Sequence, residues 1–128
     1  MDFRNMRFTT EHEWVRFADG SDEVTVGITD FAAGELGDIV YIELPEVGRK
    51  ITAGDSIGTI EAVKTVADLF APVSGEVVAV NDALQNHPEN VNKSPYEEGW
   101  FVRVRVSDRA QVDGLLTHEA YQAHIGNS

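Results

Sequence analysis

Short apolar runs recur along the chain, and their residue types are typical of β-strands. The clearest run is at 102–106, which places three valines on one face and Phe101, Arg103 and Arg105 on the other. Such alternation is typical of strands with one buried face. Strands are predicted at 13–17, 23–28, 38–44, 56–60, 75–80 and 100–106, with turns at Asp19-Gly20, Pro45 with Gly48, Gly54-Asp55, Pro72 with Ser74-Gly75, and Asn81-Asp82.

Helical signals are few and lie between or after these strands. Thr29 can cap a helix of one or two turns. Asp108, with Gln111 three residues later, resembles a capping box that opens a second helix. Thr117 can cap a last helix over 118–125. Many short strands with few helices predict a β-sandwich or a β-barrel.

The segment GTIEAVKTVADLFAP (58–72) fits a helix and a pair of strands almost equally well. In a helix, Glu61 and Asp68 would lie one turn from Lys64 and pair with it. In a hairpin, the chain would reverse at 63–65 without the Asn-Gly pair that marks most tight hairpins. Only 13 residues separate the bounding glycine and proline, which favours strands without deciding between the two.

Composition adds a strong acidic bias. The 128 residues contain 22 Asp and Glu against 10 Lys and Arg, which gives a net charge of −12. This charge disfavours nucleic acid and anionic membranes as partners, because binding to phosphates needs Lys and Arg. It favours partners with basic surfaces. Residues 51–92 hold a single cation, Lys64, among six acids.

The length fits one domain, which we expect to span 1–128 with a core at about 8–107 and a helical segment at about 108–125. No apolar run approaches the roughly 20 residues that span a bilayer. The N-terminal stretch MDFRNMRFTTEHEW also lacks the apolar centre of a signal peptide. We therefore expect a cytoplasmic protein with no membrane association.

The side chains that usually perform catalysis are absent or unsuitably spaced. There is no cysteine, which excludes thiolate metal sites and cysteine nucleophiles. His12, His87, His118 and His124 do not have the spacing of metal ligands. No phosphate-binding loop or serine-nucleophile motif is present. We expect no catalytic residue, no metal site, and hence a chain that is not an enzyme.

The stretch GTIEAVKTVADLFAPVSGEVVAVN (58–81) resembles the modification hairpin of lipoyl and biotinyl carrier domains, specifically that of glycine cleavage system H proteins. Four other stretches resemble this family in the same order: EHEWVR (11–16), VTVGITDFAAGELGDIVYIELPEVG (24–48), NDALQNHPENVN (81–92) and SPYEEGWFVRV (94–104). The resemblance implies a mainly β fold, a flattened β-barrel or hybrid barrel-sandwich of the lipoyl/biotinyl-carrier type. Short peripheral and C-terminal helices would accompany it.

The resemblance also implies a modification site. Lys64 matches the lysine that carries lipoate in amide linkage at an exposed hairpin tip. Its neighbours Val63 and Thr65 differ from the methionines that usually flank the lysine of biotin carriers, which argues against biotin. Glu61 and Gly75 match positions that lipoate-attaching enzymes read in this family.

A docking cleft and a function follow from the same resemblance. Glu13 and Asp68 match positions lining the cleft that receives the loaded arm, and Glu11 sits where some members have a small hydroxyl residue. The implied function is a lipoyl carrier of glycine cleavage. It would take an aminomethyl group from the pyridoxal-phosphate glycine decarboxylase (P protein) to the tetrahydrofolate-dependent aminomethyltransferase (T protein). Dihydrolipoyl dehydrogenase (L protein) would reoxidise it, and a monomer suits such a shuttle.

Two other interpretations stay open from the sequence. An H-like relay would donate lipoyl groups to other lipoyl-dependent complexes. An unmodified interaction domain would instead bind partners through its acidic surface, independently of Lys64.

Overall fold

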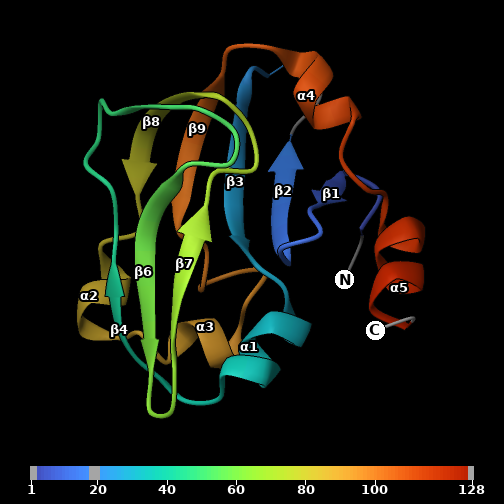
Figure 1. The fold of residues 1–128 in the computed structure, drawn as a ribbon. Helices are drawn as coiled ribbons and strands as arrows, with labels where there is room; N and C mark the ends of the chain where they lie inside the picture. Colours follow the sequence, from blue (N-terminus) through green and yellow to red (C-terminus); the bar gives the residue numbers. More distant parts are fainter. Residues whose placement is uncertain (1–2, 18–20, 127–128) are drawn as a thin grey trace.

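Two antiparallel sheets form the framework of the computed structural model, which describes residues 3–17 and 21–126 (Figure 1). One sheet has the order β1-β2-β3-β9-β8-β5 and the other the order β4-β6-β7. The strands are β1 (Met6–Phe8), β2 (Glu13–Phe17), β3 (Glu23–Ile28), β4 (Ile39–Glu43), β5 (Lys50–Ile51), β6 (Ser56–Ala62), β7 (Val66–Phe70), β8 (Gly75–Val80) and β9 (Val102–Val106). The helices are α1 (Asp30–Leu36), α2 (Ala83–Asn86), α3 (Asn90–Lys93), α4 (Arg109–Asp113) and α5 (His118–Gly126).

The two sheets share one hydrophobic core. Val26 and Val104 from the six-stranded sheet and Ile42 and Ile60 from the three-stranded sheet belong to the same buried cluster. Burial of one face of each sheet is what the predicted β-sandwich or β-barrel requires. The result is a mainly β, hybrid barrel-sandwich arrangement with short helices at its margins, which confirms the predicted fold class.

In the last strand, β9, the predicted alternation of buried and exposed side chains is right for the valines and arginines and wrong for Phe101. Its valines are buried, whereas Arg103 and Arg105 are exposed, as predicted. Phe101 was predicted to share the face of the arginines, and this was wrong. The regular strand begins only at Val102, and Phe101 is fully buried in the core.

A second cluster packs α5 against β1 and β2. Met6, Phe8, Trp14 and Tyr121 are buried in it. The Trp14 ring lies so close to Gly27 on β3 that any Cβ at Gly27 would collide with it. The C-terminal helix is therefore held by a core of its own, beside the turn that precedes β2.

Some elements had no detectable pattern. The strands β1 and β5 are three and two residues long, which is too short for an alternation to show. The four-residue helices α2 and α3 follow the predicted turn at Asn81-Asp82, where no helix was expected. The predicted turn at Asp19-Gly20 lies outside the described residues.

The predicted helix caps are present. Thr29, Asp108 and Thr117 each accept a backbone hydrogen bond from the first turn of their helices. The predicted capping box at Asp108 is incomplete, because the side chain of Gln111 accepts a hydrogen bond from the Ser74 amide at 2.6 Å. That contact ties α4 to the start of β8.

Candidate functional site

The strands β6 and β7 form a hairpin, with its tip at the lower edge of Figure 1. The Ala62 amide donates to the Thr65 carbonyl at 2.8 Å and closes a two-residue turn at Val63-Lys64. The Val63 amide donates to the Asp38 carbonyl at 3.0 Å, which fixes the tip to the segment before β4. Lys64 is exposed. The segment is therefore a hairpin and not the helix that its apolar spacing also allowed.

The turn explains why its residues lack the Asn-Gly signal of tight hairpins. Among the described residues, His12 is the only non-glycine with a positive φ angle. Val63 and Lys64 therefore do not form the I′ or II′ turns that Asn and Gly favour in two-residue hairpins. The register and the packing of the sheet, rather than the turn residues, decide where the chain reverses.

The acids beside Lys64 in the sequence belong to the strands of the hairpin. Glu61 pairs with Val66, and Asp68 pairs with Thr59. In the part of the chain that the structure describes, no carboxylate lies within ion-pair distance of the Lys64 amine. The ion pairs expected of a helix are absent, and the amine is left accessible.

A surface cleft of about 320 Å³ lies beyond the carboxyl end of β7. Its walls are mostly apolar, and it contains two carboxylates, an exposed one on Glu11 and a buried one on Glu13. Asp68 lies on β7, two residues before the cleft, and is exposed. The structure thus brings Glu11 and Glu13 together and places Asp68 on β7, between the turn and the cleft. The lining residues are Thr9, Glu11, Glu13, Ala53, Gly54, Phe70, Ala71 and Pro72.

Glu13 has an unusual electrostatic environment. The Thr9 hydroxyl donates to its Oε1 at 2.7 Å, and the Phe70 backbone is a second hydrogen-bond partner. Burial raises the pKa of Glu13 to about 7 from the ordinary value of 4.5, and the charge of Glu11 adds to this rise. The hydrogen bonds from Thr9 and Phe70 oppose the rise only in part. The carboxyl therefore changes charge near neutral pH.

The turn that carries Glu13 is held by a chain of hydrogen bonds that sequence reasoning missed. His12 has a φ of 72°, a region that non-glycine residues seldom occupy. Its Nδ1 lies 2.9 Å from the Tyr121 hydroxyl, which lies 2.8 Å from the Thr29 hydroxyl. One hydroxyl on α5 thus connects the turn before β2 with the cap of α1. No local pattern links residues so far apart in the chain.

Gly75 lies far from Lys64 in the fold. It opens β8, next to the contact between Ser74 and α4, at the opposite end of the molecule from the hairpin tip (Figure 1). A Cβ at Gly75 would collide with the carbonyl oxygen of Arg105 on the neighbouring strand. The fold itself therefore requires glycine at this position.

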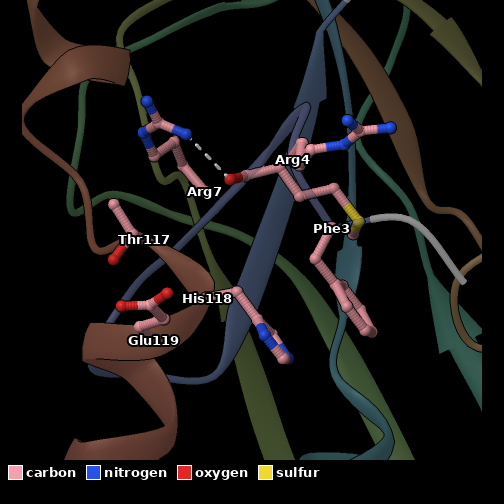
Figure 2. Close-up of a pocket in the computed structure, with 7 residues that line it drawn as sticks. Phe3, Arg4, Arg7, Thr117, His118 and Glu119 are labelled. Atoms are coloured by element: carbon pink, nitrogen blue, oxygen red, sulfur yellow. Dashed lines mark hydrogen bonds between the residues drawn. The ribbon is translucent and has the colours of Figure 1, made fainter.

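Another hollow, of about 510 Å³, lies between the first residues of the structure and the start of α5 (Figure 2). The Phe3 and His118 rings stack with centroids 3.9 Å apart, and the Arg7 guanidinium donates to the Met6 carbonyl at 3.1 Å. None of the predicted site residues lines it. It belongs to the attachment of α5 and not to the hairpin.

Comparison with known proteins agrees with this geometry. The glycine cleavage H-protein family model matches residues 6–128. The chain belongs to the glycine cleavage H-protein family. Glycine cleavage system H proteins from Geobacillus kaustophilus and Bacillus cereus strain B4264 are 52% identical over 122 residues and 58% identical over 117 residues. These alignments cover 95% and 91% of this chain and 94% and 91% of the relatives.

A crystal structure of a glycine cleavage system H protein from Mycobacterium marinum has the same fold as this H-protein family member. The TM-score is 0.88 at 40% identity, and the match covers 98% of this chain and 99% of that one. Proteins of this family are non-catalytic lipoyl carrier subunits of the glycine cleavage system. Among the described residues, no helix has the length and apolarity to cross a membrane.

Proposed function

We propose that this chain carries lipoate in amide linkage on Lys64 and serves as the aminomethyl shuttle of glycine cleavage. The observation that carries the proposal is the exposed Lys64 at the tip of the hairpin, in a member of a lipoyl-carrier family. A closed turn on two paired strands fixes the backbone while the side chain remains free. An attaching enzyme would find a single amine there, because residues 51–92 contain no other Lys or Arg.

The surroundings of the hairpin fit a lipoyl group. Asp68 lies four residues from Lys64, hence at most about 13 Å away at roughly 3.3 Å per residue, which is within the roughly 12–14 Å that a lipoyl-lysine arm extends. The apolar cleft begins two residues further on, at Phe70. Its apolar walls suit a hydrocarbon chain and a dithiolane ring, and its carboxylates suit a cationic amine. When attached, lipoate supplies the disulfide chemistry for which this cysteine-free chain has no residue of its own.

In this proposal, Glu13 and Asp68 hold the positive charge of the cargo. A cation against Glu13 favours the ionised carboxylate, and so lowers the pKa that burial has raised to about 7. The apolar walls of the cleft exclude water from the same place. Together these residues would protect an amine that is attached through sulfur from hydrolysis.

The proposed clients are those of the glycine cleavage system. They are the pyridoxal-phosphate glycine decarboxylase, the tetrahydrofolate-dependent aminomethyltransferase and dihydrolipoyl dehydrogenase. Glu61 is the proposed contact of the enzymes that attach lipoate, since it lies on the hairpin next to the tip. Gly75 keeps its proposed part in this recognition, in addition to the close strand contact described above.

Intact-mass measurement tests the attachment. Protein made in a host supplied with lipoate should carry one lipoyl adduct, and Lys64→Arg should carry none. Lys50→Arg and Lys93→Arg are matched controls that should keep the adduct. An unmodified wild type in the presence of an active ligase would contradict the proposal.

Exchange of the glycine carboxyl group with bicarbonate tests the first client. The lipoylated chain, added to glycine decarboxylase, should support this exchange, and Lys64→Arg should not. A lipoylated chain that supports no exchange would leave the shuttle without its donor enzyme and refute this part of the proposal.

A further inference from the structure

Exposed apolar side chains gather around the hairpin tip. Val63 is 68% exposed, Val66 62%, Val40 55% and Tyr41 45%. Within the described residues, only one other large apolar side chain is exposed, that of Val47. We call the four side chains of Val40, Tyr41, Val63 and Val66 the collar. Large apolar side chains that cluster on a surface indicate a place where a partner covers them.

The carboxylate of Glu61 lies between the side chains of the collar. Glu61 pairs with Tyr41 on one side and with Val66 on the other, so the three residues form one row across β4, β6 and β7. Glu61 is half-buried in this row. Val63 stands next to Lys64 in the turn, whose backbone is tied to the Asp38 carbonyl. The apolar side chains and one acid therefore form a single surface around the base of the Lys64 side chain.

The rim of this surface is acidic. Glu43 and Asp68 are exposed on the same strands, and Asp38 is exposed at the foot of the turn. An apolar centre with an acidic rim is complementary to an apolar patch that is surrounded by Lys and Arg. A basic group of the partner would meet Glu61 at the centre.

The length of the group attached at Lys64 decides which enzyme must contact this surface. The unmodified Lys64 amine extends only about 6 Å from its Cα, at roughly 1.2–1.3 Å per bond. An enzyme that acts on the amine must therefore bring its active site down onto the hairpin. Enzymes that act on the far end of a lipoyl arm can stay about 12–14 Å away by the same bond count. The surface next to the lysine is thus covered most closely during attachment.

We infer that the collar is the docking surface of the acyltransferase that modifies Lys64. This inference rests on the proposed function. In the reaction, the neutral amine attacks the carbonyl carbon of an activated lipoyl group, an acyl adenylate or a thioester. The new C–N bond replaces the bond to the leaving group, which departs with its electron pair, and the nitrogen loses a proton to a base.

The test compares attachment with later turnover. Val63→Thr/Val66→Thr keeps the β-branched shape that strands favour but replaces one apolar methyl group in each residue by a hydroxyl. Its initial rate of lipoyl attachment, with a purified ligase, lipoate and ATP at limiting apo-protein, should fall about fivefold or more. Val47→Thr is the matched control, because Val47 is 60% exposed and lies outside the collar. Its rate should stay within about twofold of wild type.

Three results would overturn the inference. The first is an unchanged attachment rate in the double variant, with thermal unfolding showing that the variant is folded. The second is an equal loss in Val47→Thr. The third is a loss of glycine–bicarbonate exchange, after complete lipoylation, as large as the loss of attachment, since the collar would then serve the client. A wild type that takes no lipoyl adduct is a different result and refutes the proposed function itself.

Discussion

Lys64 and Glu13 are two ionisable side chains in opposite surroundings. Lys64 stands in solvent at a turn, whereas Glu13 is buried in a cleft with a pKa near 7. An exposed amine can be modified, and a buried carboxyl can hold a charge that water would otherwise solvate. The two residues therefore suit successive tasks, attachment of an arm and stabilisation of its cargo.

Glu13→Gln should change how stability depends on pH. The pKa of Glu13 is higher in the folded state than in the unfolded state, so its protonated form stabilises the fold below about pH 4.5. That contribution is lost as the pH rises through 7. The variant should therefore gain about 2 kcal/mol of unfolding free energy relative to wild type between pH 5 and pH 8.

Urea unfolding at pH 5, 6, 7 and 8 measures this difference. Glu43→Gln is the matched control, because the side chain of Glu43 is exposed and stays in water in both states. A constant difference between Glu13→Gln and wild type across this range would show that the burial of Glu13 has no electrostatic consequence.

At the scale of elements, the cleft proposed to receive the arm is built from segments that meet only in the fold. The cleft joins the turn before β2, the turn between β5 and β6, and the end of β7. The C-terminal helix α5 supports the first of these pieces through the Tyr121 hydroxyl. Helix α5 is thus a brace for the cleft rather than part of its lining.

Tyr121→Phe should weaken the attachment of α5 to the turn before β2. The change removes the hydroxyl that contacts His12 and Thr29 and leaves the half-buried imidazole and the buried Thr29 hydroxyl without that partner, at a cost of about 1–2 kcal/mol. Hydrogen exchange of amides in the 9–13 turn should accelerate more than that of amides in β9. Tyr41→Phe, at an exposed tyrosine, should change neither quantity. Equal exchange in the turn and in β9 would show only global destabilisation.

Gly75→Ala separates the structural part of Gly75 from recognition. Its Cβ would collide with the Arg105 carbonyl between β8 and β9, so the variant should lose at least about 1–3 kcal/mol of unfolding free energy. Gly34→Ala, in α1 with open space around its Cβ, should be neutral or gain up to about 1 kcal/mol. Denaturant unfolding measures both. A Gly75→Ala variant of wild-type stability would leave recognition as the only reason for this glycine.

For the whole molecule, the charge is distributed unevenly. On the six-stranded sheet, cross-strand pairing places Lys50, Glu76, Arg105 and Glu23 in one row of alternating sign. Arg105 and Glu23 lie 3.7 Å apart there. Around the hairpin, Lys64 is the only cation within residues 51–92. One cation against six acids leaves residues 51–92, which include the hairpin, with little compensation of their negative charge.

Two variants with the same net charge test whether this distribution matters. Asp38→Asn/Glu43→Gln removes two acids near the hairpin, and Glu97→Gln/Glu98→Gln removes two exposed acids after α3. Both pairs change the net charge from −12 to −10 by removing two negative charges. At low ionic strength the first pair should slow association of the lipoylated chain with glycine decarboxylase by about twofold or more relative to the second. Stopped-flow measurement of the association rates tests this difference. Equal rates for the two double variants would show that only the net charge, and not its distribution, affects association.

The sequence by itself determined the features that depend on near neighbours. The short β-rich runs between turn residues located six of the strands, and Thr29, Asp108 and Thr117 located helix starts. These signals lie in residues only a few positions apart in the chain. The isolation of Lys64 and the family motifs around it were also visible in the chain. Periodicity left 58–72 open between a helix and a hairpin, and the hairpin that the structure shows was implied by the family resemblance alone. Only the tertiary structure decided that Glu13 is buried and that the Tyr121 hydroxyl supports its turn. These properties depend on contacts between distant segments, for which no local pattern exists.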